Sequence, residues 1–181
     1  MLFRSFGFIY PSDTPDDLID TWKSYLDKLL AVLEEDGEAI YVGVDAARPN
    51  NEKYQATAGA VLFRNKSLIN ASRHTVGRVT SAEAELAAIC TGVEVAVRLQ
   101  STRIIIFTDS IAQARRAVDP SAHSGQPDSL RACRALRMWF GQGTARHITF
   151  VWVPSKLEWG PHHEAHKYLR EFPLIPGREL R

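Results

Sequence analysis

The chain has 181 residues, of which 45% are hydrophobic and 24% are charged. These values match an ordinary globular domain, so they exclude disordered, collagen-like and coiled-coil classes and a large multidomain assembly. With 22 basic and 21 acidic side chains, the net charge of +1 neither requires nor excludes a nucleic-acid partner. The two cysteines, Cys90 and Cys133, are too few for a disulfide scaffold, lack the spacing of a zinc site, and fit a reducing cytoplasmic or nuclear compartment.

The N-terminal part of the chain, residues 1–38, is expected to be an extension that contains one amphipathic helix. No apolar run reaches the roughly 18 residues of a membrane span, and Gly7 and Pro11 interrupt the apolar start. We therefore expect no export signal and no membrane partner. From Thr14 to Gly37, with Thr14 as the N-cap, one apolar stripe recurs at helical spacing: Leu18, Trp22, Leu26, Leu29 and Leu33. This stripe is expected to pack on the main domain or on a missing neighbour.

The segment that follows predicts three antiparallel strands and a long helix. The strands are expected at Ala39–Val44, ending at Asp45, at Gly59–Phe63 and at Leu68–Val76. The helix is expected over Thr80–Gln100, because Thr80 and Glu83 can form a capping box. Its core face is expected to carry Leu86, Ile89, Val93 and Val97.

The remaining elements alternate strands with helices. Strands are predicted at Arg103–Phe107 and Ile148–Val153, and helices from Ser110 to Val118, over Leu130–Phe140 and over Pro161–Glu171. The order implies an α/β fold with a five-stranded mixed sheet, in which three antiparallel strands precede two parallel strands and helices cover both faces. The main domain is then expected at residues 39–171, with a C-terminal tail at 172–181.

Three acidic residues fall at element ends, where core packing does not require them. Asp45 closes the first strand, Glu85 lies in the first turns of the long helix, and Asp109 closes the fourth strand. If the first and fourth strands are neighbours, the carboxylates converge, and two divalent cations would relieve their repulsion. Such a site selects magnesium or manganese and supports phosphodiester hydrolysis. Taken singly, Asp45 is equally well explained as a loop start and Asp109 as a helix cap.

In this order, the motifs resemble the ribonuclease H family over about Ala39 to Glu171. The blocks that carry the resemblance are Val44-Asp45-Ala46-Ala47, Thr80-Ser81-Ala82-Glu83-Ala84-Glu85, Ile106-Phe107-Thr108-Asp109-Ser110, and Trp152-Val153-Pro154-Ser155-Lys156 with Gly160-Pro161-His162-His163-Glu164-Ala165-His166. The closing block is similar to ribonuclease H domains of fungal non-LTR (LINE-type) retrotransposons. The resemblance implies a ribonuclease H-like fold and an endoribonuclease that cleaves the RNA strand of RNA:DNA hybrids with two divalent cations. It also implies a preceding reverse transcriptase domain as a possible partner.

The resemblance assigns the metal-binding positions one by one. Asp45, Glu85 and Asp109 match the first three acids of the family, whereas His166 stands where the family has its fourth. Since imidazole suits manganese better than magnesium, we expect Mn²⁺ to be preferred over Mg²⁺. His162 lies four residues before His166, so it is expected on the same helix face and could join it. For His162, His163 and His166 the alternative is an exposed helix start without a metal.

The resemblance also suggests which residues hold the nucleic acid. Thr80 and Ser81 match hydroxyl- or amide-bearing family positions, while Ala82 has lost its polar group, and Lys156 stands where many members carry a mobile histidine. The tryptophans are expected to serve mostly in core or rim packing, and Trp159, beside Gly160, is the one whose stacking on bases would be tested. A spaced basic row, formed by Arg131, Arg134 and Arg137, is either a solvated helix face or a nucleic-acid surface.

Two other functions stay open at this level. A catalytically weak or silent hybrid-binding or scaffold domain would explain the histidine at position 166 and the lysine at position 156. A DNA-cleaving relative, of the transposase or exonuclease type, would keep the acids and change the substrate.

Overall fold

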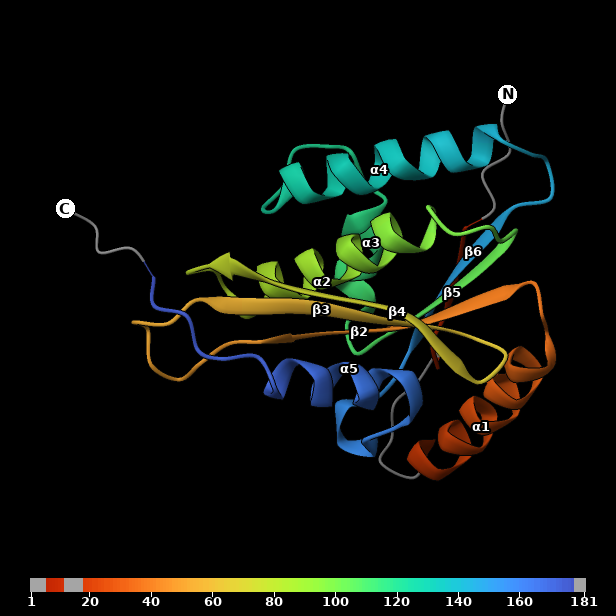
Figure 1. Cartoon of the computed structure of the whole chain (residues 1–181), viewed down its shortest axis with the longest axis horizontal. Helices are drawn as coiled ribbons and strands as arrows, with labels where there is room; N and C mark the ends of the chain where they lie inside the picture. Colours follow the sequence, from red (N-terminus) through yellow and green to blue (C-terminus); the bar gives the residue numbers. More distant parts are fainter. Residues whose placement is uncertain (1–5, 12–17, 178–181) are drawn as a thin grey trace.

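A mixed six-stranded sheet lies at the centre of the computed structural model, which describes residues 6–11 and 18–177 (Figure 1). The strand order is β1-β6-β5-β2-β3-β4. β2, β3 and β4 form an antiparallel meander, and β5, β6 and β1 continue the sheet parallel to β2. The bounds are Phe6–Ile9 for β1, Ala39–Ala47 for β2, Ala56–Arg64 for β3, Ser67–Gly77 for β4, Arg103–Thr108 for β5 and His147–Trp152 for β6.

The predicted mixed α/β architecture is confirmed, but the predicted number of five strands is wrong. The additional strand is β1, which pairs in parallel with β6 at the edge of the sheet. Phe8 lies opposite Phe150 in this pairing, and their rings stack with centroids 5.4 Å apart. β1 has only four residues and no alternating pattern or hairpin turn beside it, so its partner strand, distant in sequence, determines its conformation.

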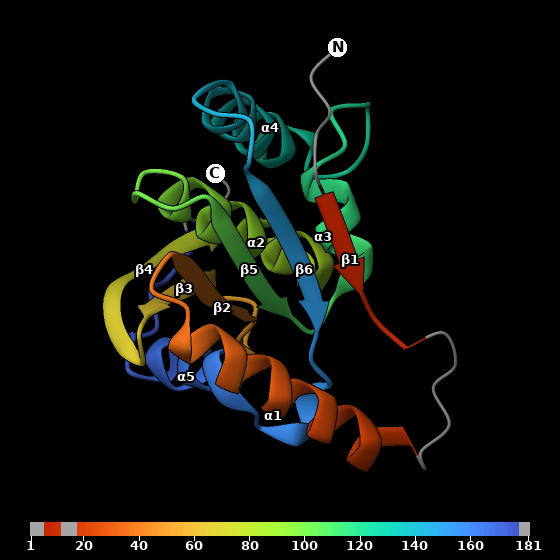
Figure 2. The same cartoon turned by 90° about the vertical axis from the view of Figure 1, so that its right-hand side faces the viewer.

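In the described part of the chain, five α-helices cover the two faces of the sheet (Figures 1 and 2). α2, α3 and α4 lie on one face, and α1 and α5 lie on the other. Their bounds are Ile19–Glu35 for α1, Ser81–Ala96 for α2, Ile111–Ala117 for α3, Gln126–Gly141 for α4 and Gly160–Arg170 for α5. Within the described ranges, no helix has the length and apolar character needed to cross a membrane.

Two hydrophobic clusters separate the sheet from its helices. The larger lies under α2 and α4 and contains Leu86, Ile89 and Val93, as the helical pattern predicts, whereas Val97 is only partly buried at its margin. The smaller lies under α1 and α5, and Leu26 and Leu33 of α1 are buried in it. The apolar stripe of α1 therefore packs on the sheet. The predicted N-cap Thr14 lies outside the described residues.

Two glycines allow α5 to lie directly against the sheet. A Cβ atom at Gly43 of β2 would lie 1.8 Å from the carbonyl oxygen of Pro161, and one at Gly59 of β3 would lie 2.8 Å from Leu169 Cδ2. Any larger residue at Gly43 would displace the start of α5. Side chains two residues apart point to the same face of a strand, so Asp45 faces α5 as well.

Candidate metal centre

Asp45 lies inside β2 and faces the start of α5. The prediction that this strand ends at Asp45 is wrong, because antiparallel pairing with β3 continues through Asp45 and Gly59 to Ala47 and Thr57. Only 4% of the Asp45 surface is exposed. A buried carboxylate requires a charged or hydrogen-bonding partner, and histidines of α5 provide it.

Asp109 follows the last residue of β5, next to β2. Because β2 and β5 are adjacent and parallel, their carboxyl ends lie at the same edge of the sheet, and this brings Asp109 toward Asp45 as predicted. The helix-cap explanation for Asp109 does not hold, since the Ser110 hydroxyl is the cap and accepts from the Gln113 backbone N–H at 3.4 Å. The indole N–H of Trp152 donates to the Asp109 carbonyl oxygen at 3.2 Å and fixes the backbone there.

Glu85 reaches the same place from α2. Burial, followed by the charges of Asp109 and Asp45, raises the pKa of Glu85 to about 9. Burial also raises the pKa of Asp109, and the nearby His162 opposes this shift. Without a cation, Glu85 is therefore protonated at neutral pH and shares a hydrogen bond with Asp109. Glu85 and Asp109 therefore resist ionising together in the metal-free protein.

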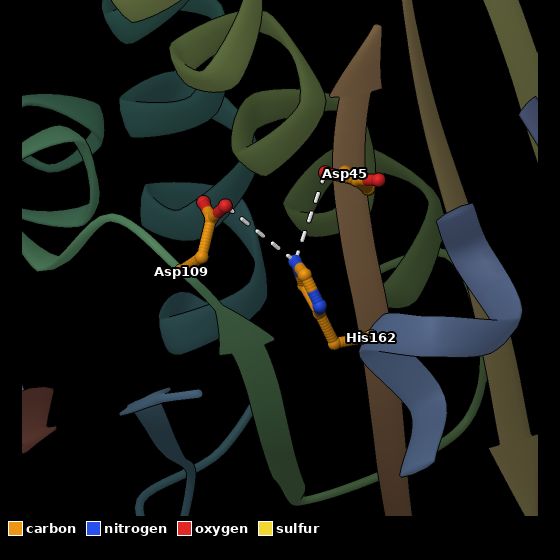
Figure 3. A group of neighbouring side chains, drawn as sticks. All are labelled: Asp45, Asp109 and His162. Carbon is orange, nitrogen blue, oxygen red and sulfur yellow. Dashed lines mark ion pairs between the residues drawn. The ribbon is translucent and has the colours of Figure 1, made fainter. Parts of the chain in front are cut away.

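Two histidines of α5 complete the cluster. His166 Nδ1 lies 2.8 Å from Asp45 Oδ2, which is hydrogen-bond distance. His162 Nε2 lies 3.6 Å from Asp45 Oδ1 and 3.9 Å from Asp109 Oδ2. Figure 3 shows the His162 ring pointing between the two aspartates.

The structure gives His162 a more central place than the sequence predicted. Asp45, Asp109 and His162 each offer a ligand atom, and these three atoms lie within 4.8 Å of one another. Sequence reasoning placed His166 in the fourth metal position and His162 only beside it. The signal for His162 was its four-residue spacing from His166, but spacing alone does not show which imidazole reaches both carboxylates.

Two buried polar atoms of the cluster lack a hydrogen-bond partner among the described residues. They are Glu85 Oε2 and His162 Nε2. Buried polar atoms are rarely left unpaired, and a divalent cation would satisfy both. Oxygen ligands with one or two imidazoles form a donor set that fits manganese well and magnesium less well. The residues present therefore fit a divalent-metal site.

The cluster opens into a cavity of about 260 Å³. Its lining comes from β2, α2, the end of β5, the turn after β6 and α5: Asp45, Ala46, Glu85, Asp109, Ser155, Glu158, His162, His163 and His166. All four predicted metal-binding residues, Asp45, Glu85, Asp109 and His166, are thus in one cavity.

The predicted nucleic-acid residues lie around this cavity rather than in it. The Thr80 hydroxyl is engaged in the capping box, where it donates to Glu83 Oε2 at 2.9 Å and accepts from the Glu83 backbone N–H at 3.2 Å. Ser81 is exposed at the start of α2. Lys156 is exposed in the 3₁₀ turn Ser155–Leu157 and does not line the cavity.

Trp159 is a core residue, so the suggestion that it stacks on bases is wrong. Only 5% of its surface is exposed, and its ring packs edge-on against Phe107 with centroids 5.0 Å apart. Its indole N–H donates to Asp27 Oδ1 of α1 at 2.8 Å, and this bond lowers the pKa of Asp27. Trp159 anchors the start of α5 to α1.

The sheet order, with one carboxyl group inside β2, one directly after β5 and one in the first turns of α2, is that of a ribonuclease H-like α/β protein. The model of the reverse transcriptase-like family matches residues 43–154, and the chain belongs to this family. The matched region contains Asp45, Glu85 and Asp109 and ends before α5. No curated protein gives a significant match to the chain.

Solved structures share this fold at low sequence identity. The N-terminal RNase H domain of Rv2228c from Mycobacterium tuberculosis is 23% identical, with a TM-score of 0.50 over 66% of this chain and 89% of that chain. The PFV RNase H domain is 18% identical, with a TM-score of 0.50 over 72% and 88%. A foamy viral protease-reverse transcriptase, solved with an RNA/DNA hybrid, is 14% identical, with a TM-score of 0.52 over 88% of this chain and 20% of that chain. These similarities show a ribonuclease H-like fold.

Proposed function

We propose that the protein is a metal-dependent ribonuclease H that cleaves the RNA strand of RNA:DNA hybrids. The observation that carries this proposal is the convergence of Asp45, Glu85 and Asp109 in one cavity, with raised pKa values at Glu85 and Asp109. The family match and the fold support it. An origin in a LINE-type retrotransposon, with a preceding reverse transcriptase as partner, belongs to the same proposal and rests on the closing motif of the sequence. A place in the cytoplasm or nucleus is also proposed, and it rests on the two cysteines.

Asp45, Glu85 and Asp109 would hold the cations, with His162 and His166 as nitrogen ligands. Two divalent cations bound there would activate water for attack and would stabilise negative charge at the scissile phosphate. Glu85 must lose its proton when a cation binds, because its pKa in the metal-free protein lies above neutral pH. In the metal-free protein His166 Nδ1 lies 2.8 Å from Asp45 Oδ2, and this contact would open when both side chains bind a cation. The two imidazoles favour manganese over magnesium.

Ser81 and Lys156 are exposed and stand close in sequence to residues that line the cavity, Ser81 one helical turn before Glu85 and Lys156 directly after Ser155. Lys156 is a point charge suited to a phosphate, and Ser81 offers a hydroxyl to the backbone or to a ribose. Thr80 would contact the nucleic acid through its hydroxyl only if the capping box opened, so its role as a direct contact is the weakest of the three. The foamy viral relative that was solved with an RNA/DNA hybrid supports the choice of substrate.

The test is cleavage of a hybrid whose RNA strand is fluorescently labelled, with Mn²⁺ or Mg²⁺ added in turn. We expect the RNA strand to be cut faster with Mn²⁺, and we expect Asp109→Asn to lower the rate at least about 100-fold. Double-stranded RNA and duplex DNA serve as competing substrates. Faster cleavage of duplex DNA would show that the protein is a DNA-cleaving enzyme of the transposase or exonuclease type. Absence of cleavage in both metals, or full activity of Asp109→Asn, would overturn the proposal.

A silent hybrid-binding domain is the second candidate, and one contact favours it. In the metal-free protein the 2.8 Å contact between His166 Nδ1 and Asp45 Oδ2 occupies two atoms that would otherwise be available to a cation. If this contact persists, the protein would bind the hybrid without cutting it in Mn²⁺. Binding measured alongside the cleavage assay separates the two functions.

A further inference from the structure

A second and larger cavity, of about 1050 Å³, lies at the other end of the sheet from the carboxylate cluster. It is bounded by the end of α2, by α4 and by the loop that leads into β5. Ser101 and Thr102 of this loop precede β5, whereas Asp109 follows it. A strand of six residues spans about 20 Å, so the two cavities are separate.

Arginines dominate the lining of this second cavity, which we call the arginine cavity. Five of them line it, Arg64, Arg98, Arg131, Arg134 and Arg146, together with two carboxylates, Glu38 and Glu94. Five positive and two negative charges leave a local charge of +3, in a chain whose net charge is only +1. Of the basic row predicted on α4, Arg131 and Arg134 line the cavity, whereas Arg137 lies outside it.

Two of the arginines are held in place by contacts that satisfy only part of their donors. Arg64 donates to the Gln100 carbonyl oxygen, and Arg146 donates to the Ser101 carbonyl oxygen at 3.3 Å while its guanidinium lies over the Trp139 ring. The Nε–H groups of Arg64 and Arg146 are buried and have no acceptor among the described residues. Two buried N–H donors of the cavity lining are therefore left without an acceptor.

The other three arginines differ in how they are paired. Arg131 pairs with Glu94 at 3.2 Å and with Asp128, so most of its charge is balanced. Arg98 and Arg134 are exposed, and neither has an acidic partner in the part of the chain that the structure describes. Their guanidinium groups are available to an external anion.

We propose that the arginine cavity binds the phosphate groups of a nucleotide or of a nucleic-acid strand. Guanidinium groups bind phosphate oxygens through paired, charge-assisted hydrogen bonds, and several of them around one cavity select a ligand with more than one negative charge. The volume of about 1050 Å³ accommodates a nucleotide or a short stretch of backbone. This site does not depend on the proposed nuclease function, because it shares no residue with the carboxylate cluster.

The test uses the full chain in EDTA, so that no divalent cation occupies the carboxylate cluster. Binding of ATP is measured by calorimetry, and binding of a fluorescently labelled 12-nucleotide single strand of thymidines is measured by anisotropy. The variant is the double substitution Arg98→Ala with Arg134→Ala, which removes two exposed side chains without a described partner. We expect it to weaken binding at least about tenfold, since it removes two charge-assisted contacts.

The matched control is Arg137→Ala, an exposed arginine on the same helix outside the cavity. We expect the affinity of this control to lie within about twofold of that of the unmodified chain. The double variant and the control should both have the melting temperature of the unmodified chain. Binding of ATP identifies a nucleotide site, and binding of the oligonucleotide alone identifies a strand site; either result supports the proposal if only the double variant loses it. Equal weakening by Arg137→Ala would indicate diffuse charge attraction and would overturn the proposal, as would the absence of binding by both probes.

Discussion

At the scale of single residues, the cluster of acids opposes folding as long as no cation is bound. The folded-state pKa of Glu85 is about 9, whereas that of an unshifted glutamate is 4.5. A raised folded-state pKa of an acid means that the folded chain holds a proton which the unfolded chain releases above pH 4.5. The metal-free fold therefore loses stability as the pH rises from about 4.5 toward about 9.

We therefore expect Glu85→Gln to raise the stability of the metal-free protein and to abolish its activity. Glutamine keeps the shape of a protonated glutamate, so in EDTA at pH 8 we expect the free energy of unfolding to rise by about 1–2 kcal/mol. The difference should disappear near pH 4.5, and cleavage of the hybrid should be lost. Urea unfolding across this pH range checks the prediction, and a variant that is less stable than the parent at pH 8 would contradict it.

The role of His162 is tested by metal affinity. Since its unpaired Nε2 points between Asp45 and Asp109, we expect His162→Ala to weaken Mn²⁺ binding about 10- to 100-fold. His163→Ala is the matched control, because His163 lines the cavity but is not one of the three residues that bring ligand atoms together. Calorimetric titration of Mn²⁺ measures both, and equal affinities would remove His162 from the ligand set.

The sequence was sufficient to predict the acidic residues of the site but not the order of its histidines. Asp45, Glu85 and Asp109 stand in motifs that carry the family resemblance, so they could be named before the fold was known. Which histidine reaches two carboxylates depends on how closely α5 approaches β2. The contact between Gly43 and Pro161, which are far apart in the chain, determines this distance.

At the scale of secondary-structure elements, local chemistry determines some boundaries and tertiary pairing determines others. The capping box of Thr80 and Glu83 fixed the start of α2, and the structure confirms it. In contrast, the end of β2 and the existence of β1 depend on partner strands, so strand propensity alone did not show them.

Because α5 packs closely against β2, we can predict the effect of a substitution at Gly43. An alanine there would place its Cβ against the Pro161 carbonyl, so we expect Gly43→Ala to cost about 1–3 kcal/mol of stability and to lower cleavage by moving His162 and His166. Gly141→Ala is the control, since no atom lies within 4 Å of a Cβ at that position. Urea unfolding compares the two variants. If Gly43→Ala leaves the free energy of unfolding and the cleavage rate unchanged, the close packing of α5 on β2 is contradicted.

At the scale of the whole molecule, α1 belongs to the structure that supports the site. Trp22 of α1 donates to the Trp152 carbonyl oxygen at 2.9 Å, and Trp152 in turn donates to the Asp109 carbonyl oxygen at 3.2 Å. Trp159 joins α1 to the start of α5 through Asp27. Helix α1 thus contacts the end of β6, which in turn bonds the backbone of Asp109, and the residue that precedes the helix carrying the histidines. The boundaries at residues 38 and 172 stay predictions.

We therefore expect α1 to unfold together with the sheet. Leu26→Ala removes a fully buried side chain and should cost about 2–5 kcal/mol, whereas Val32→Ala on the exposed face should change stability by no more than about 0.5 kcal/mol. Both proteins should show one transition by circular dichroism and by tryptophan fluorescence. Two separate transitions would mean that α1 is an independent extension.

The most direct test of a metal-dependent site is diffraction from a crystal soaked in Mn²⁺, with data recorded at the manganese absorption edge. We expect anomalous peaks within about 2.5 Å of carboxylate oxygens of Asp45, Glu85 and Asp109, and of an imidazole nitrogen of α5. A well-ordered crystal at saturating Mn²⁺ without a peak between these side chains, and with His166 still bonded to Asp45, would contradict this expectation.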